Sequence, residues 1–157
     1  CPCGYLGDPQ RECTCTDGEI RRYGQKISGP LLDRIDLHVS VMRPKYSELT
    51  ATIQGEPSCD IAKRVAEARA VQAERLSRWH MQSNAQMGHR QLKETCQLDA
   101  EGTEMLRVVF EKLHLSARSY DRIIKVARTI ADLAGSDQIR PEHVAEAISF
   151  RNMINGK

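Results

Sequence analysis

The sequence has few aromatic residues and no long hydrophobic run, and both shortages narrow the class of protein that it encodes. Phe, Trp and Tyr together make up 4% of the 157 residues. The core must therefore be built from aliphatic side chains and methionine, the usual material of helix-on-helix packing. No stretch approaches the roughly 18 consecutive apolar residues of a membrane-spanning helix, and no signal-peptide pattern opens the chain. We expect a mainly α-helical, cytoplasmic protein without a membrane partner.

An excess of charge of one sign is also lacking. The chain has 23 Lys and Arg residues against 21 Asp and Glu residues, a formal net charge of +2. So small an excess does not support binding to nucleic acid through the overall charge of the protein, and any contact with a polyanion must be local. The hydrophobic fraction of 40% and the charged fraction of 28% are typical of a globular protein.

The motifs of a complete nucleotide-hydrolysing site are absent as well. The sequence contains no Gly-rich phosphate loop ending in Lys-Ser/Thr, and no apolar run that ends in paired acidic residues. It begins with cysteine instead of methionine, so we expect further residues upstream in the natural protein. Taken alone, these residues are not expected to hydrolyse ATP.

Cysteine, by contrast, is concentrated near the start. Four of the six cysteines, Cys1, Cys3, Cys13 and Cys15, form two C-x-C pairs. Glycines and a proline between the pairs permit tight turns that bring the pairs together. Four thiolates suit tetrahedral Zn²⁺ and leave no open position for catalysis. Free thiols on a loop and two disulfides are the alternative interpretations.

The alternation of apolar and polar residues over 35–42 (IDLHVSVM) predicts one half-buried strand. It follows a short helix predicted over 19–27 and a break at Ser28–Pro30. A lone strand cannot satisfy its backbone hydrogen-bonding groups, so we expect its sheet partners to lie outside this sequence.

Apolar residues at helical spacing predict four helices after a linker over 46–57. The first begins near Ser58 and ends in the polar stretch 82–91. The second spans 99–113. The third, the clearest, has Ser116 as its N-cap and stops at Gly135. The last opens at Pro141.

Two arginines lie at positions from which they could bind a phosphate group. Arg34 lies between a Leu-bearing turn and the predicted strand, and Arg118 lies in the first turn of the third helix, where the helix dipole favours anions. Arg122 follows one turn later and could contact the same ligand. On pattern alone, a solvated surface charge is the favoured interpretation of Arg34 and Arg118, and it remains the alternative for Arg122.

The sequence resembles the ComM/YifB group of Mg-chelatase-like AAA+ ATPases, relatives of magnesium chelatase and of the MCM helicases, over nearly its whole length. The resemblance is carried, in order, by CPCGYLGDP with CTC, SGPLLDRIDLHV, IAKRVAEARAVQAER, NAQM, and LSARSYDRIIKVARTIADLAGS with HVAEAISFR. Its most specific parts are SGPLLDRIDLHV and LSARSYDRIIKVARTIADLAG.

The resemblance implies a mainly α fold, in which a four-helix AAA+ lid follows the end of an α/β AAA+ core with one strand and a Cys-rich loop. It implies residues 1–45 as the end of the core, 46–57 as a linker and 58–157 as the lid. Arg34 matches the arginine finger that acts on a neighbouring subunit's nucleotide, and Arg118 matches the sensor-2 arginine, with Arg122 beside it.

At the level of the whole protein, the resemblance implies a hexameric ring motor that uses ATP and Mg²⁺. It also implies action on DNA, as a branch-migration motor or helicase in natural transformation. A zinc-containing helical module that binds protein or DNA without nucleotide is the alternative. A Walker A loop encoded upstream of Cys1 would distinguish the two.

Overall fold

A computed structural model describes residues 1–39, 41, 44, 46, 50 and 55–151. The chain divides into two compact units. The cysteine unit comprises Cys1–Ile35 and Val39–Ile53, and the helical unit comprises Asp36–His38 and Gln54–Lys157. Each unit is described by itself.

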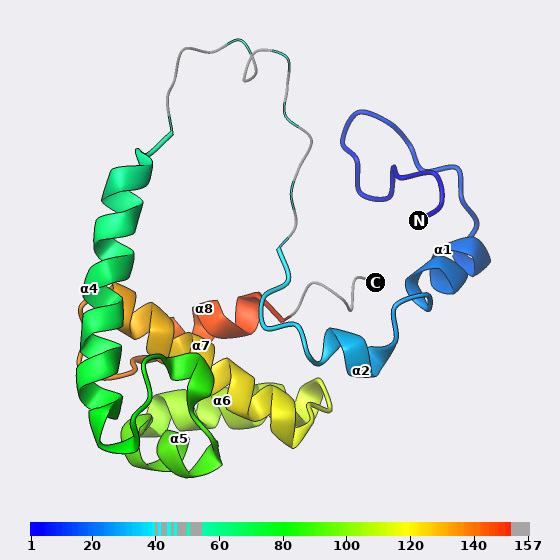
Figure 1. Cartoon of the computed structure of the whole chain (residues 1–157). Helices are drawn as coiled ribbons and strands as arrows, with labels where there is room; N and C mark the ends of the chain where they lie inside the picture. The colour runs from blue at the N-terminus through cyan, green and yellow to red at the C-terminus, as the bar shows by residue number, and fades with distance from the viewer. Residues whose placement is uncertain (40, 42–43, 45, 47–49, 51–54, 152–157) are drawn as a thin grey trace. The chain divides into compact units, whose positions relative to one another are not determined.

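The cysteine unit contains two short helices, α1 (Asp17–Gly24) and α2 (Gly29–Leu32) (Figure 1). A capping box starts α1: the Glu19 backbone N–H donates to Thr16 Oγ1 at 3.3 Å, and the Thr16 backbone N–H donates to Glu19 Oε2 at 2.9 Å. The helix therefore begins and ends earlier than the predicted range of 19–27. Ser28 caps α2, whose second residue is Pro30.

None of the described residues of the cysteine unit is buried. Its larger apolar side chains, such as Leu6 and Ile27, are 56% and 50% exposed. This part of the chain therefore has no hydrophobic core of its own among the described residues.

The strand predicted over 35–42 is not formed by its described residues, 35–39 and 41. Its apolar positions are instead exposed, with Val41 88% exposed. The physical reason is that a strand needs a partner, and the described part of the chain supplies no neighbouring strand to this segment. Residues 40 and 42, and most of the predicted linker over 46–57, lie outside the described residues.

The helical unit is built around α7 (Ala117–Leu133), which packs against three other helices, α8 (Pro141–Ser149), α4 (Ser58–Leu76) and α5 (His89–Thr95) (Figure 1). α6 (Ala100–Lys112) packs against α8. Two 3-10 turns, η1 (Ser77–Trp79) and η2 (Asn84–Gln86), connect α4 to α5. The fully buried core includes the side chains of Leu76, Met87, Leu106, Ile123 and Val144.

The mainly α fold is confirmed, and the four predicted helices are present in the helical unit. α4 begins at Ser58, Ser116 caps α7 through the Ser119 N–H at 3.1 Å, and Pro141 opens α8. Gly135, with a φ of +66°, follows the end of α7. α5 was not predicted. Every described helix is too short or too polar to cross a lipid bilayer.

Candidate functional site

Arg34 follows directly on α2 and its C-cap Asp33. Its backbone N–H donates to the Leu31 carbonyl oxygen at 3.0 Å, which continues the helical turn as far as this residue. The residue is exposed. A capped turn with proline near its start thus fixes the backbone from which the guanidinium extends.

Arg118 is the second residue of α7 and is exposed. Within the described part of the chain, no side chain or backbone group forms a hydrogen bond or ion pair with its guanidinium. The first turn of α7 carries no acidic residue. A cation next to the positive end of a helix is unfavourable. An anion bound at this position would therefore offset the unfavourable interaction between Arg118 and the helix dipole.

Arg122 lies one turn further along α7 and has a different environment. Its Nη1 forms an ion pair with the carboxylate of Asp36, and its side chain is 24% exposed. Both residues line a cavity of ≈ 440 Å³ with apolar walls that include Leu37 and Phe150. The Asp36 carboxylate therefore already compensates the charge of Arg122, whereas Arg118 has no such partner among the described residues.

The structure brings together the sulfurs of Cys1, Cys3, Cys13 and Cys15. All four Sγ atoms lie within 4.8 Å of one another, and all four cysteines are free. A backbone hydrogen bond from Tyr5 lowers the pKa of Cys3 to about 6. A backbone hydrogen bond from Cys15 would lower the pKa of Cys13, but desolvation and the Cys3 and Cys15 thiols outweigh it, so the pKa of Cys13 is raised instead. Of these two cysteines, Cys3 is therefore the one whose pKa favours the thiolate, the form that binds metal ions.

A buried ionic network joins α4 to α7, and the sequence patterns did not predict it. The Asp132 carboxylate is fully buried, and it accepts hydrogen bonds from both Nη atoms of Arg75 at 2.8 and 2.7 Å. It also accepts from Arg128 Nε at 2.9 Å and Asn84 Nδ2 at 2.8 Å. The available signal was the Arg128–Asp132 spacing of four residues on the most amphipathic helix. The network holds the helices together and has no feature of a catalytic site.

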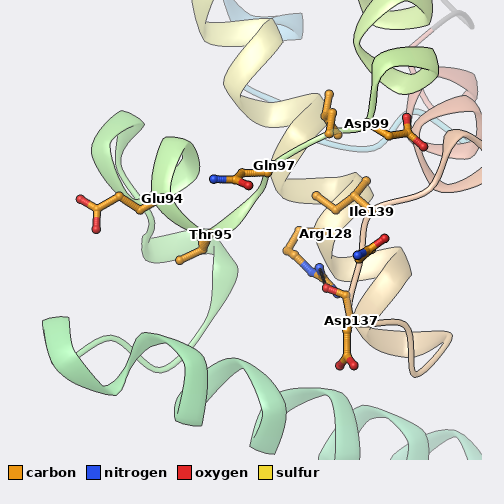
Figure 2. Close-up of a pocket in the computed structure, with 9 residues that line it drawn as sticks. Glu94, Thr95, Gln97, Asp99, Arg128, Asp137 and Ile139 are labelled. Carbon is orange, nitrogen blue, oxygen red and sulfur yellow. Dashed lines mark hydrogen bonds between the residues drawn. The ribbon is translucent and has the colours of Figure 1, made fainter.

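Arg128 also lines a cavity of ≈ 420 Å³ (Figure 2). The acidic side chains labelled there, Glu94, Asp99 and Asp137, point in different directions. Glu94 accepts from Arg78 and Arg90, and Asp99 caps α6 through the Gly102 N–H at 2.7 Å. Glu94 and Asp99 thus have structural partners, and the three carboxylates do not converge on a cation.

Comparison with known proteins assigns a family to this arrangement. Residues 55–151 match the family model described as "Magnesium chelatase, subunit ChlI C-terminal", and residues 1–49 match "Magnesium chelatase, subunit ChlI".

Individual relatives resemble the chain over most of its length. Competence protein ComM of Haemophilus influenzae is 38% identical over 137 residues, which cover 87% of the chain and 26% of that protein. The protein YifB of Escherichia coli is 36% identical over 148 residues, 94% of the chain and 28% of YifB. The chain thus spans little more than a quarter of the length of these relatives. Since the C-terminal family model alone matches more than half of the residues, the chain belongs to the magnesium chelatase ChlI family.

Proposed function

We propose that the chain is the C-terminal part of an AAA+ ATPase of the Mg-chelatase type, and that it supplies two arginines to nucleotide sites. The observation that carries this proposal is Arg118, an exposed arginine without a partner among the described residues, in the first turn of α7. A guanidinium at a helix start binds phosphate oxygens by charge and by paired hydrogen bonds. The family match supports nucleotide and Mg²⁺ as the ligands. Arg118 is the sensor-2 arginine in this proposal.

Arg34 is the arginine finger in the same proposal. The support for it is its place in LLDRID, within the residues matched by the ChlI family model, and its exposure directly after the turn formed by α2. An arginine finger supplied in trans neutralises charge that develops in phosphoryl transfer. The role therefore requires a ring of several copies, in which each Arg34 serves a neighbour's nucleotide.

The domain organisation follows from the same assignment. We place the end of the AAA+ core at 1–45, a linker at 46–57 and the lid at 58–157. The change of family model between residues 49 and 55 supports this division. The phosphate loop and the acidic Mg²⁺ ligands would lie in the part of the relatives that the chain does not cover, since the chain itself lacks both motifs.

DNA is the substrate that we propose for the whole protein, in the cytoplasm, with branch migration as the activity. The support is the resemblance to the ComM/YifB group, including a relative named a competence protein. The net charge of +2 gives no support of its own.

The finger assignment is tested in the full-length protein with Arg34→Ala. ATP turnover should fall roughly a thousandfold or more while ATP binding is retained, because the finger acts mainly on the transition state. The matched control is Arg22→Ala, which removes another exposed arginine of the cysteine unit and should leave turnover unchanged. Rings that mix Arg34→Ala subunits with subunits lacking the phosphate-loop lysine should recover some activity. Wild-type turnover by Arg34→Ala at saturating ATP would overturn the assignment.

Arg118→Ala tests the second arginine separately. It should reduce hydrolysis and also weaken nucleotide affinity, because a lid arginine contacts ground-state phosphates as well. Arg69→Ala, at an exposed position on α4, is the control and should change neither quantity. If nucleotide affinity and turnover of Arg118→Ala equal those of the control, the arginine is a surface charge. A full-length protein that binds no nucleotide at all would favour the alternative of a metal-containing binding module.

A further inference from the structure

The four clustered cysteines are arranged around a common centre, without an evident preference for disulfide pairs. The Sγ atoms of Cys1 and Cys3 are 3.5 Å apart, those of Cys3 and Cys13 3.5 Å, and those of Cys1 and Cys13 3.6 Å. Cys15 Sγ lies within 4.8 Å of the other three. A disulfide requires a sulfur separation of about 2.05 Å. Three nearly equal separations single out no pair for oxidation.

These separations suit a single tetrahedral metal ion. With a zinc–sulfur bond of about 2.3 Å, the edges of a regular tetrahedron of sulfurs measure about 3.8 Å. The three closest separations fall a few tenths of an ångström below this value. An iron–sulfur cluster places several metal ions and bridging sulfides between its cysteines, and so requires wider spacing than this cluster provides.

The backbone around the sulfurs is also shaped for a thiolate site. Gly4 and Gly7 have φ values of +82° and +79°, a region that glycine adopts without strain. The first of these turns lets the Leu6 backbone N–H donate to Cys1 Sγ at 3.2 Å. Hydrogen bonds from backbone N–H groups to ligand sulfurs offset the negative charge that several thiolates bring to one place.

We propose that Cys1, Cys3, Cys13 and Cys15 bind one Zn²⁺ ion, and that this ion holds the loop over 1–16 in its fold. No residue of the loop over 1–16 is buried, and a segment this short usually depends on a metal, a disulfide or association to fold. Cys15 directly precedes Thr16, the N-cap of α1. Metal binding therefore fixes the point at which α1 begins. The site goes beyond the proposed ATPase function and does not depend on it.

The test measures metal directly in the purified whole chain under reducing conditions. Elemental analysis should find about one zinc per molecule, and Co²⁺ exchanged into the site should give the visible absorption of tetrahedral thiolate coordination. Cys13→Ser should lower the zinc affinity at least tenfold, because it removes one ligand. Cys59→Ser is the matched control. Cys59 is an exposed cysteine at the start of α4, outside the cluster, and its replacement should leave the zinc content unchanged.

A second measurement separates metal binding from general unfolding. Removal of zinc by a chelator should accelerate amide exchange in residues 1–24, while the thermal unfolding of the helical unit stays the same. The proposal is overturned if the reduced chain contains no stoichiometric metal, or if Cys13→Ser retains as much zinc as Cys59→Ser. It is also overturned if the chelator does not change the amide exchange rates in residues 1–24. None of these readouts involves ATP, so they distinguish failure of the metal site from failure of the ATPase proposal.

Discussion

Asp132 is the buried carboxylate at the centre of the ionic network that joins α4 to α7. Its side chain is fully buried between Arg75, Arg128 and Asn84. We expect Asp132→Ala to lower the free energy of unfolding by about 3–5 kcal/mol, because it leaves two partly or fully buried guanidinium groups without their carboxylate. Urea unfolding followed by circular dichroism measures this change.

The control for that prediction is Glu111→Ala. Glu111 also pairs with an arginine, Arg107, but its side chain is 61% exposed, and exposed pairs contribute about 0–1 kcal/mol. Equal losses in the two variants would contradict the importance given to the buried network.

The same carboxylate predicts how stability depends on pH. Burial alone would raise the pKa of Asp132, but hydrogen bonds from Arg75 and Asn84 and the charges of Arg128 and Arg75 outweigh it, so the pKa is lowered. A lowered folded-state pKa means that the contribution to stability is complete above the unfolded-state value of about 3.9 and is lost as the pH falls through the folded-state value. Urea midpoints measured from pH 7 down to pH 3 should therefore fall less steeply for Asp132→Asn than for the wild type. Parallel curves would show that Asp132 titrates normally.

At the scale of single residues, sequence patterns identified candidate metal ligands better than they identified which charged residues are buried. The cysteine spacing predicted a cluster, which the structure forms. The burial of Arg128 and Asp132 was not predicted because charged residues are normally exposed. The third charge of the network, Arg75, reaches Asp132 only through the tertiary packing of α4 on α7, which the sequence pattern does not show.

At the scale of elements, helices were predicted correctly where the sequence shows both amphipathic periodicity and capping residues. α7 was predicted from Ser116 to Gly135 because its apolar stripe is long and both ends carry clear signals. α5 was missed because it is short and lies next to a polar stretch, and Leu92 is its buried residue. The strand was predicted from alternation alone, and alternation does not supply the hydrogen-bonding partner that a strand requires.

The ion pair between Arg122 and Asp36 ties the short segment Asp36–His38 to α7 and gives a prediction about that segment. The His38 backbone N–H donates to the Phe150 carbonyl oxygen at 2.9 Å, just after α8. Arg122→Gln should speed amide exchange at His38 several-fold, because the ion pair that holds Asp36 to α7 is lost.

Arg107→Gln serves as the control for this exchange experiment. Arg107 pairs with exposed carboxylates within α6, so its replacement should leave the exchange rate at His38 unchanged. Unchanged exchange in Arg122→Gln as well would show that the ion pair does not hold the segment.

At the scale of the whole molecule, the chain by itself should not hydrolyse ATP. The sequence has no phosphate loop and no paired acidic residues after an apolar run, and phosphoryl transfer depends on both for positioning the phosphates and Mg²⁺. Phosphate release by the purified chain should equal the background of an Arg34→Ala, Arg118→Ala double variant. Turnover that copurifies with the chain and disappears in the double variant would contradict this expectation.

The uneven burial of α4 has a mechanical consequence. Every residue from Ser58 to Glu67 is exposed, and burial against the rest of the unit begins at Ala68. At 1.5 Å per residue, about 15 Å of helix extends beyond its support. A force applied to the exposed part of α4 therefore acts as a torque on the packed part of the helix, which runs from Ala68 to Leu76.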